Sequence, residues 1–166
     1  MNIDDIVKIL IPPSVREYRD GASIKYSVID KLTLEEKEGV TNRLIELLHE
    51  KQSPDDFIVD TLVYLKVEKA LPILKELLEK EKGKVLKIML IMAIFYISND
   101  QSMIELALDT AKKTKDKLDF ANVLRKISRF NSQKINNYIQ SFTNHPDGLI
   151  AKSAQSALIS AQNIIP

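Results

Sequence analysis

Cysteine and tryptophan are absent from this 166-residue sequence, and it contains only four glycines and six prolines. Without cysteine the chain can form no disulfide, no thiolate zinc site and no cysteine nucleophile. Glycine and proline dominate the turns of all-β proteins, so their small number disfavours a turn-rich β fold. Composition alone therefore points away from a disulfide scaffold, a zinc finger and a β-sandwich.

Long apolar runs are also missing. The longest, residues 88–97, has ten residues and follows Lys84 and Lys87 closely, whereas a membrane-spanning helix needs about 20 apolar residues. Residues 1–5 are acidic and precede no long apolar run, so they do not resemble a secretory signal. We therefore expect a cytoplasmic protein with no membrane partner, in which residues 88–97 belong to a helix buried on all sides.

Charge of one sign is not in excess over the whole chain, whose net charge is +1. Residues 1–83 carry 13 Lys and Arg against 17 Asp and Glu, whereas residues 84–166 carry 11 against 6. The first half is therefore net −4 and the second net +5. Nucleic-acid-binding proteins usually have a pervasive basic excess, and only the second half could supply one here.

Apolar residues are present at every third or fourth position, which predicts helices with one apolar stripe each. The pattern also recurs after about thirty residues, because residues 44–51 (LIELLHEK) resemble residues 74–81 (LKELLEKE). The last apolar residues of successive segments are Leu32, Leu65, Ile97, Ile127 and Leu158. A repeat of this length predicts helix pairs that bury their apolar stripes only against neighbouring pairs.

Turn and capping residues divide the chain into five such pairs. Pro12 and Pro13 separate the first two helices, Thr33 and Glu36 form a capping box, and Ser53 is expected to cap the helix that follows. Short connections predict antiparallel neighbours, so we predict an all-α superhelix, or solenoid, in one domain of residues 1–166. The predicted pairs are 3–10 with 14–32, 33–51 with 53–65, 70–81 with 84–98, 102–114 with 116–129, and 132–144 with 148–162.

Two segments resemble a known repeat family. Residues 69–78 read KALPILKELL and residues 53–65 read SPDDFIVDTLVYL, and they are similar to the first and second helices of a HEAT repeat. The resemblance is best over residues 33–98, although Asp60 stands where the family often has arginine. Tetratricopeptide arrays have a similar period, but their signature positions are not filled.

The HEAT-like resemblance implies a scaffold or a binder. Some small bacterial members resemble immunity proteins that sit on one toxin, and others bind nucleic acid or are associated with lyases.

Motifs for catalysis, cofactors or metals are not apparent. His49 and His145 have no second ligand at i+3 or i+4. The acidic pairs at residues 4–5 and 55–56 open helices, where carboxylates complement the helix dipole. No phosphate-binding glycine loop or nucleophile motif occurs. We predict a protein that is not an enzyme and uses no cofactor or metal; an enzyme with dispersed catalytic residues is a further alternative.

The register of the second helices predicts a binding surface. When these helices are aligned on their last core residues, their non-core faces carry Asp60, Tyr64, Met92, Tyr96, Lys126 and Arg129. In a HEAT-like stack this face would line the inner surface, which would run from acidic to aromatic to basic. Tyrosine and arginine are frequent hot-spot residues. The alternative is that Tyr64, Met92 and Tyr96 pack between repeats.

We therefore predict a module that binds another protein along one face, and in its most concrete form an immunity protein that blocks a cognate toxin or effector. The alternative function is nucleic-acid binding by the basic second half, whose densest basic segment is residues 112–117.

Overall fold

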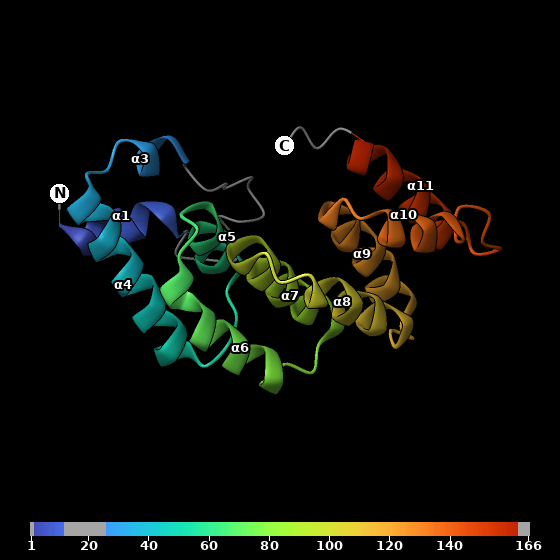
Figure 1. Cartoon of the computed structure of the whole chain (residues 1–166), viewed down its shortest axis with the longest axis horizontal. Coiled ribbons are helices and arrows are strands. Elements are labelled where there is room, and N and C mark those ends of the chain that lie inside the picture. Colours follow the sequence, from blue (N-terminus) through green and yellow to red (C-terminus); the bar gives the residue numbers. More distant parts are fainter. Residues whose placement is uncertain (1, 12–25, 163–166) are drawn as a thin grey trace. The chain divides into compact units, whose positions relative to one another are not determined.

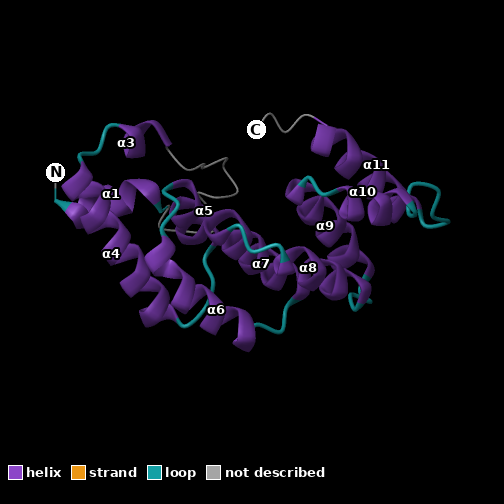
Figure 2. Ribbon diagram, in the orientation of Figure 1, coloured by secondary structure: helices purple, strands orange, loops and turns teal. Residues whose placement is uncertain are grey.

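The computed structural model describes residues 2–11 and 26–162, and every regular element within these ranges is a helix (Figure 1, Figure 2). The predicted all-α class is therefore confirmed for this part of the chain. Internal contacts divide the protein into two compact units, Met1–Leu77 (unit 1) and Leu78–Pro166 (unit 2). The prediction of one domain stays a prediction, and the units are described separately.

Unit 1 is built around α4 (Leu34–Lys51), the longest helix among the described residues. Helix α4 packs against α1 (Ile3–Leu10) and α5 (Asp56–Tyr64). The unit also contains α3 (Tyr26–Asp30), a 3₁₀ turn η1 (Glu68–Ala70) and the first part of α6 (Leu71–Lys80). Its fully buried side chains include Ile6, Leu10, Leu44, Leu48, Ile58 and Leu62. These residues recur at helical spacing, as the apolar stripe predicted.

The start of α4 confirms the predicted capping box. The Thr33 hydroxyl accepts the N–H of Glu36 at 3.2 Å, and the Glu36 carboxylate accepts the N–H of Thr33 at 3.0 Å. That second bond lowers the pKa of Glu36. The predicted N-cap of the next helix is wrong. The N-cap of α5 is Asp55, two residues after the predicted Ser53, and its carboxylate accepts the N–H groups of Phe57 and Ile58.

Replacement of Thr33 by alanine is expected to lower the free energy of unfolding by about 1 kcal/mol, because it leaves the Glu36 N–H without its side-chain acceptor. Urea denaturation followed by circular dichroism would measure the change. Thr33→Ser keeps the hydroxyl and should stay close to the parent. Equal losses for Thr33→Ser and Thr33→Ala would show that the cap is not what stabilises this helix start.

Unit 2 contains five α-helices and one 3₁₀ turn among its described residues after α6. They are α7 (Lys84–Ser98), α8 (Ser102–Lys112), α9 (Lys117–Ile127), η2 (Ser128–Phe130), α10 (Gln133–Gln140) and α11 (Gly148–Gln162). Helix α7 packs against α8 and α9, α9 packs against α11, and α11 also contacts α10. Alternate helices α7, α9 and α11 thus pack in series, an arrangement compatible with a helical repeat.

Helix α7 is the buried helix that its composition predicts. All side chains from residue 88 to residue 94 are buried, whereas Tyr96 near the helix end is 36% exposed. Neighbours on several sides explain a helix without a polar face. Within residues 2–11 and 26–162, no helix is long and apolar enough to cross a membrane.

The predicted boundaries of the later helices are close to those observed. Helices α7 and α11 match the predicted ranges 84–98 and 148–162, whereas α8, α9 and α10 end two to four residues early. Of the predicted helix 14–32, the structure describes only the part containing α3. Pro12 and Pro13, which are predicted to separate the first two helices, lie outside the described residues.

Candidate functional site

The predicted surface residues fall in both units. Asp60 and Tyr64 lie on α5 in unit 1, whereas Met92, Tyr96, Lys126 and Arg129 belong to unit 2. Each group is therefore described by itself, and a continuous groove through all six residues stays a prediction.

In unit 1, Tyr64 forms an exposed aromatic pair with Tyr26 of α3. The two rings lie 4.4 Å apart between centroids, and the residues are 43% and 41% exposed. The Tyr64 hydroxyl donates to Oδ1 of Asp30, also on α3, at 2.6 Å. This bond to a carboxylate raises the pKa of Tyr64, because it favours the protonated phenol. Asp60, one turn earlier on α5, is half-buried.

In unit 2, Tyr96 forms a hydrogen bond with η2, the 3₁₀ turn that follows α9. Its hydroxyl donates to the backbone carbonyl of Arg129 in η2. The neighbouring Phe95 ring lies 5.0 Å from the ring of the buried Phe130, between centroids. Burial raises the pKa of Tyr96. The structure therefore brings Tyr96 and Arg129 together, but through the arginine backbone, and the Arg129 side chain remains exposed next to a half-buried Lys126.

Met92 does not belong to the predicted surface. It is 6% exposed, so its side chain offers a partner almost no area. Helix α7 packs against both α8 and α9, and Met92 is one of the buried residues of α7. The burial of Met92 favours the alternative that its side chain packs between helices.

Unit 1 also contains a pocket that the sequence did not predict. It has a volume of about 420 Å³ and lies between α1 and α4. Val7, Ile11 and Leu47 supply its apolar surface, and its charged lining residues are Asp4, Lys8, Arg43 and Lys51. Volumes of roughly 300–1,000 Å³ are typical of ligand sites.

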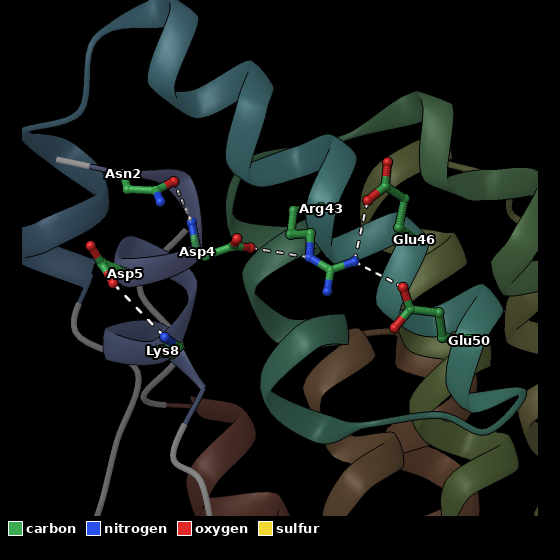
Figure 3. Close-up of polar contacts among 7 residues, drawn as sticks. All are labelled: Asn2, Asp4, Asp5, Lys8, Arg43, Glu46 and Glu50. Carbon is green, nitrogen blue, oxygen red and sulfur yellow. Dashed lines mark hydrogen bonds and ion pairs between the residues drawn. The ribbon is translucent and has the colours of Figure 1, made fainter.

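Arg43 is the centre of a charge network beside this pocket (Figure 3). Its Nε lies 3.3 Å from Oδ1 of Asp4 on α1. Its Nη1 lies 3.3 Å from Oε2 of Glu46 and 2.9 Å from Oε1 of Glu50, both on α4. These partners, Glu50 first, raise the pKa of Arg43. One guanidinium therefore holds three carboxylates from two helices.

The other two cations of the pocket also have acidic neighbours. Lys51 lies 2.6 Å from Asp55, and Lys8 lies 3.9 Å from Asp5. The charged lining residues of the pocket are thus three cations and one carboxylate, Asp4, and each of the three cations is paired with at least one carboxylate. The sequence showed Arg43, Glu46 and Glu50 one or two turns apart on one helix, but nothing in it linked them to Asp4.

No metal site is apparent in the part of the chain that the structure describes, where no group of three or more potential ligands comes together. His145 has a structural contact instead, because its Nδ1 accepts the N–H of Asp147 at 3.1 Å. His49 lies exposed near the end of α4.

Comparisons of the chain with protein-family models, curated proteins and solved structures found no match. The resemblance to HEAT repeats therefore stays a prediction from the sequence, and the packed helices are compatible with a helical repeat.

Proposed function

We propose that the chain is a protein-binding module with a HEAT-like architecture and no catalytic activity. The observation that carries this proposal is the exposed pair of Tyr26 and Tyr64, whose geometry is fixed by the bond from Tyr64 to Asp30. A ring already held in place loses little conformational freedom when a partner covers it. Tyrosine also offers a large apolar area at low entropic cost, which is why it is frequent in binding sites.

Tyr96 supplies a second anchor of the same kind in unit 2. It is 36% exposed and bonded to the Arg129 carbonyl, with the Arg129 side chain exposed beside it. Arginine, like tyrosine, is enriched among hot-spot residues. Tyr64, Tyr96 and Arg129 are therefore the predicted residues that we retain as principal contacts, with Asp60 and Lys126 beside them.

In its most concrete form, the proposal is an immunity protein that occupies one toxin or effector. The opposite net charges of the two halves of the chain, −4 and +5, support a dedicated single partner. Opposed charge patches favour fast and selective association with a complementary surface. An adjacent toxin gene in the genome would identify the partner to test.

Tyr64→Ala is expected to weaken partner binding by about 2 kcal/mol, or roughly thirtyfold, which is the threshold of a hot spot. The partner would be captured from cells of the source organism with the tagged chain, identified, purified and titrated by calorimetry. Tyr64→Phe keeps the ring but removes its hydrogen bond to Asp30, so it should lose some affinity but less than Tyr64→Ala. Leu34→Ala is the control, because Leu34 is 87% exposed. A partner that binds Tyr64→Ala as tightly as the parent would refute this contact.

Nucleic-acid binding is the second candidate, and a charge pattern in unit 2 favours it. Lys113, Lys117 and Lys134 have acidic partners. By contrast, Lys112 and Lys115 form no ion pair with another described residue, so they are available to phosphates. This function predicts that log affinity for duplex DNA falls linearly with log salt, and that Lys112→Gln with Lys115→Gln reduces the slope by roughly 2. Absence of retention on heparin at low salt would reject it.

A further inference from the structure

We propose that the basic cluster at the end of α9, formed by Arg125, Lys126 and Arg129, binds an acidic helix of the partner protein through carboxylates spaced one turn apart. This inference names the chemical class of the partner segment and rests on the proposed protein-binding function. Arg125 and Lys126 lie in the last turn of α9, and Arg129 follows in η2. Tyr96, near the end of α7, borders the basic cluster because its hydroxyl donates to the Arg129 carbonyl.

The charge of the basic cluster is not neutralised within the described part of the chain. Arg125, Lys126 and Arg129 form no ion pair with another described residue, whereas three lysines elsewhere in unit 2 each have a carboxylate partner. Arg43 in unit 1 is in the opposite condition, because it holds three carboxylates (Figure 3). Unit 2 as a whole has the sign of the basic cluster, with 13 Lys and Arg against 8 Asp and Glu in residues 78–166. The basic cluster therefore attracts an anionic group.

Arg125 is held in place by neutral groups. Its Nη2 donates to Oδ1 of Asn122, three residues earlier on α9, at 2.6 Å, and its Nε donates to the carbonyl oxygen of Ala121 at 3.4 Å. These bonds orient the guanidinium without neutralising its charge, and Nη1 makes no hydrogen bond with a described residue. Hydrogen bonds from a guanidinium to a carboxylate are charge-assisted and strong. A side chain oriented beforehand also loses less conformational freedom when the partner binds.

The spacing of the basic cluster fits an acidic helix. Arg125 and Arg129 are both exposed and are four residues apart, about one helical turn. The helix dipole favours cations at this end of α9, but like charges at this spacing repel each other. An anionic partner relieves that repulsion. Two carboxylates at i and i+4 on a partner helix have the matching spacing.

Tyr96 adds an aromatic contact beside the two arginines. Burial raises the pKa of Tyr96, and the positive charge of Arg129 opposes this rise, so the guanidinium lies near the phenol. Tyr96 is 36% exposed, which leaves part of the ring for the aliphatic carbons of the partner's side chains. Tyrosine and arginine are both enriched among hot-spot residues.

The basic cluster suits a protein partner better than nucleic acid. Proteins that bind nucleic acid gain affinity from the number of phosphates that they contact, and three cations supply few such contacts. Lys113, Lys117 and Lys134 in the same unit are already paired with carboxylates. Phosphate binding is therefore a competing outcome that the experiment must separate from carboxylate binding.

Three fluorescein-labelled helical peptides of equal length would test this proposal against the full-length chain by anisotropy. The first carries glutamate pairs at i and i+4 on one face of an alanine-based helix. The second carries glutamine at these positions, and the third carries lysine. We expect the Glu peptide to bind about tenfold more tightly than the Gln peptide at low salt and the Lys peptide to bind most weakly, because complementary charges select the partner. A labelled DNA duplex is the fourth probe.

Variants of the chain locate the contact. Arg125→Gln and Arg129→Gln should each weaken binding of the Glu peptide several-fold and reduce its salt dependence, because exposed charges are screened by salt. Lys152→Gln is the matched control, since Lys152 is exposed on α11 and has no ion pair with another described residue, and it should bind like the parent. Asn122→Ala keeps every charge, so it should weaken binding but leave the salt dependence unchanged. That difference would identify Asn122 as a positioning residue for Arg125.

The stability of the variants separates a binding role from a structural one. Circular dichroism would verify that each variant is folded. In urea denaturation, Arg125→Gln should not lower the free energy of unfolding, because it removes a like-charge repulsion. A loss of stability with unchanged peptide binding would mean that Arg125 serves the helix end and not a partner, which would overturn the proposal.

Other results would also overturn it. Equal binding of the Glu and Gln peptides would show that the basic cluster does not select carboxylates, and no binding of any peptide would reject the site. Tighter binding of the DNA duplex, lost in the Arg125 and Arg129 variants, would assign the basic cluster to nucleic acid. A captured partner that binds these two variants as tightly as the parent would reject this contact while the protein-binding function stands. If no protein partner is captured at all, the proposed function fails, so the two failures are distinguishable.

Discussion

Ile94→Ala is expected to lower the free energy of unfolding by about 2–5 kcal/mol, the usual cost of truncating a large core side chain. Ile94 is fully buried on α7, which packs against α8 and α9. The substitution removes apolar contacts and leaves a cavity between three helices that can collapse only in part. Urea denaturation would measure the loss, and hydrogen exchange of the α9 amides would show that it arises in unit 2.

Ile159→Ala is the matched control for Ile94→Ala. Ile159 is the same residue type in the same unit but is 61% exposed, so the expected change is within about 0.5 kcal/mol. A loss below about 1 kcal/mol for Ile94→Ala would contradict the structure, because it would mean that α7 is not the packed centre of unit 2.

Local patterns made several features predictable from the sequence. The capping box at Thr33 and Glu36 depends on residues three apart, so its chemistry is complete within one turn of helix. The burial of α7 follows from its ten-residue apolar run, which leaves no polar face to turn toward water. Most helix boundaries also follow from spacing and turn residues, whereas the arrangement of the helices in five pairs stays a prediction.

Contacts between distant residues were not predictable. The ion pair of Asp4 with Arg43 joins two helices, and the hydroxyl of Tyr96 is satisfied by a backbone carbonyl, which every residue possesses. Met92 illustrates a different limit. Helical register gives the direction of a side chain but not whether another helix covers it, and α8 and α9 both pack on α7.

The 3₁₀ turn η2 connects the core of unit 2 with the candidate surface of that unit, and Ser128 and Phe130 are the buried residues of the turn. Phe130 is 5% exposed and lies against Phe95, which precedes Tyr96 in the chain. The turn also packs against α9, α10 and α11. Arg129, whose carbonyl accepts the Tyr96 hydroxyl, is the residue directly before Phe130. The position of Arg129 therefore depends on how firmly Phe130 is held.

Phe130→Ala is expected to cost about 3–5 kcal/mol of stability, the range for removal of a buried aromatic ring. Phe130→Leu keeps most of the volume and should cost much less. The energetic coupling between Phe130 and Tyr96 can be measured separately, from the free energies of unfolding in a double-mutant cycle of Phe130→Ala and Tyr96→Phe. If the Phe130 ring holds the Arg129 carbonyl in place for Tyr96, the two losses will not add, and their coupling energy will be on the order of 0.5 kcal/mol or more. Additive losses would show that Tyr96 and Phe130 act independently, and that the geometry of this candidate surface does not depend on the core beneath it.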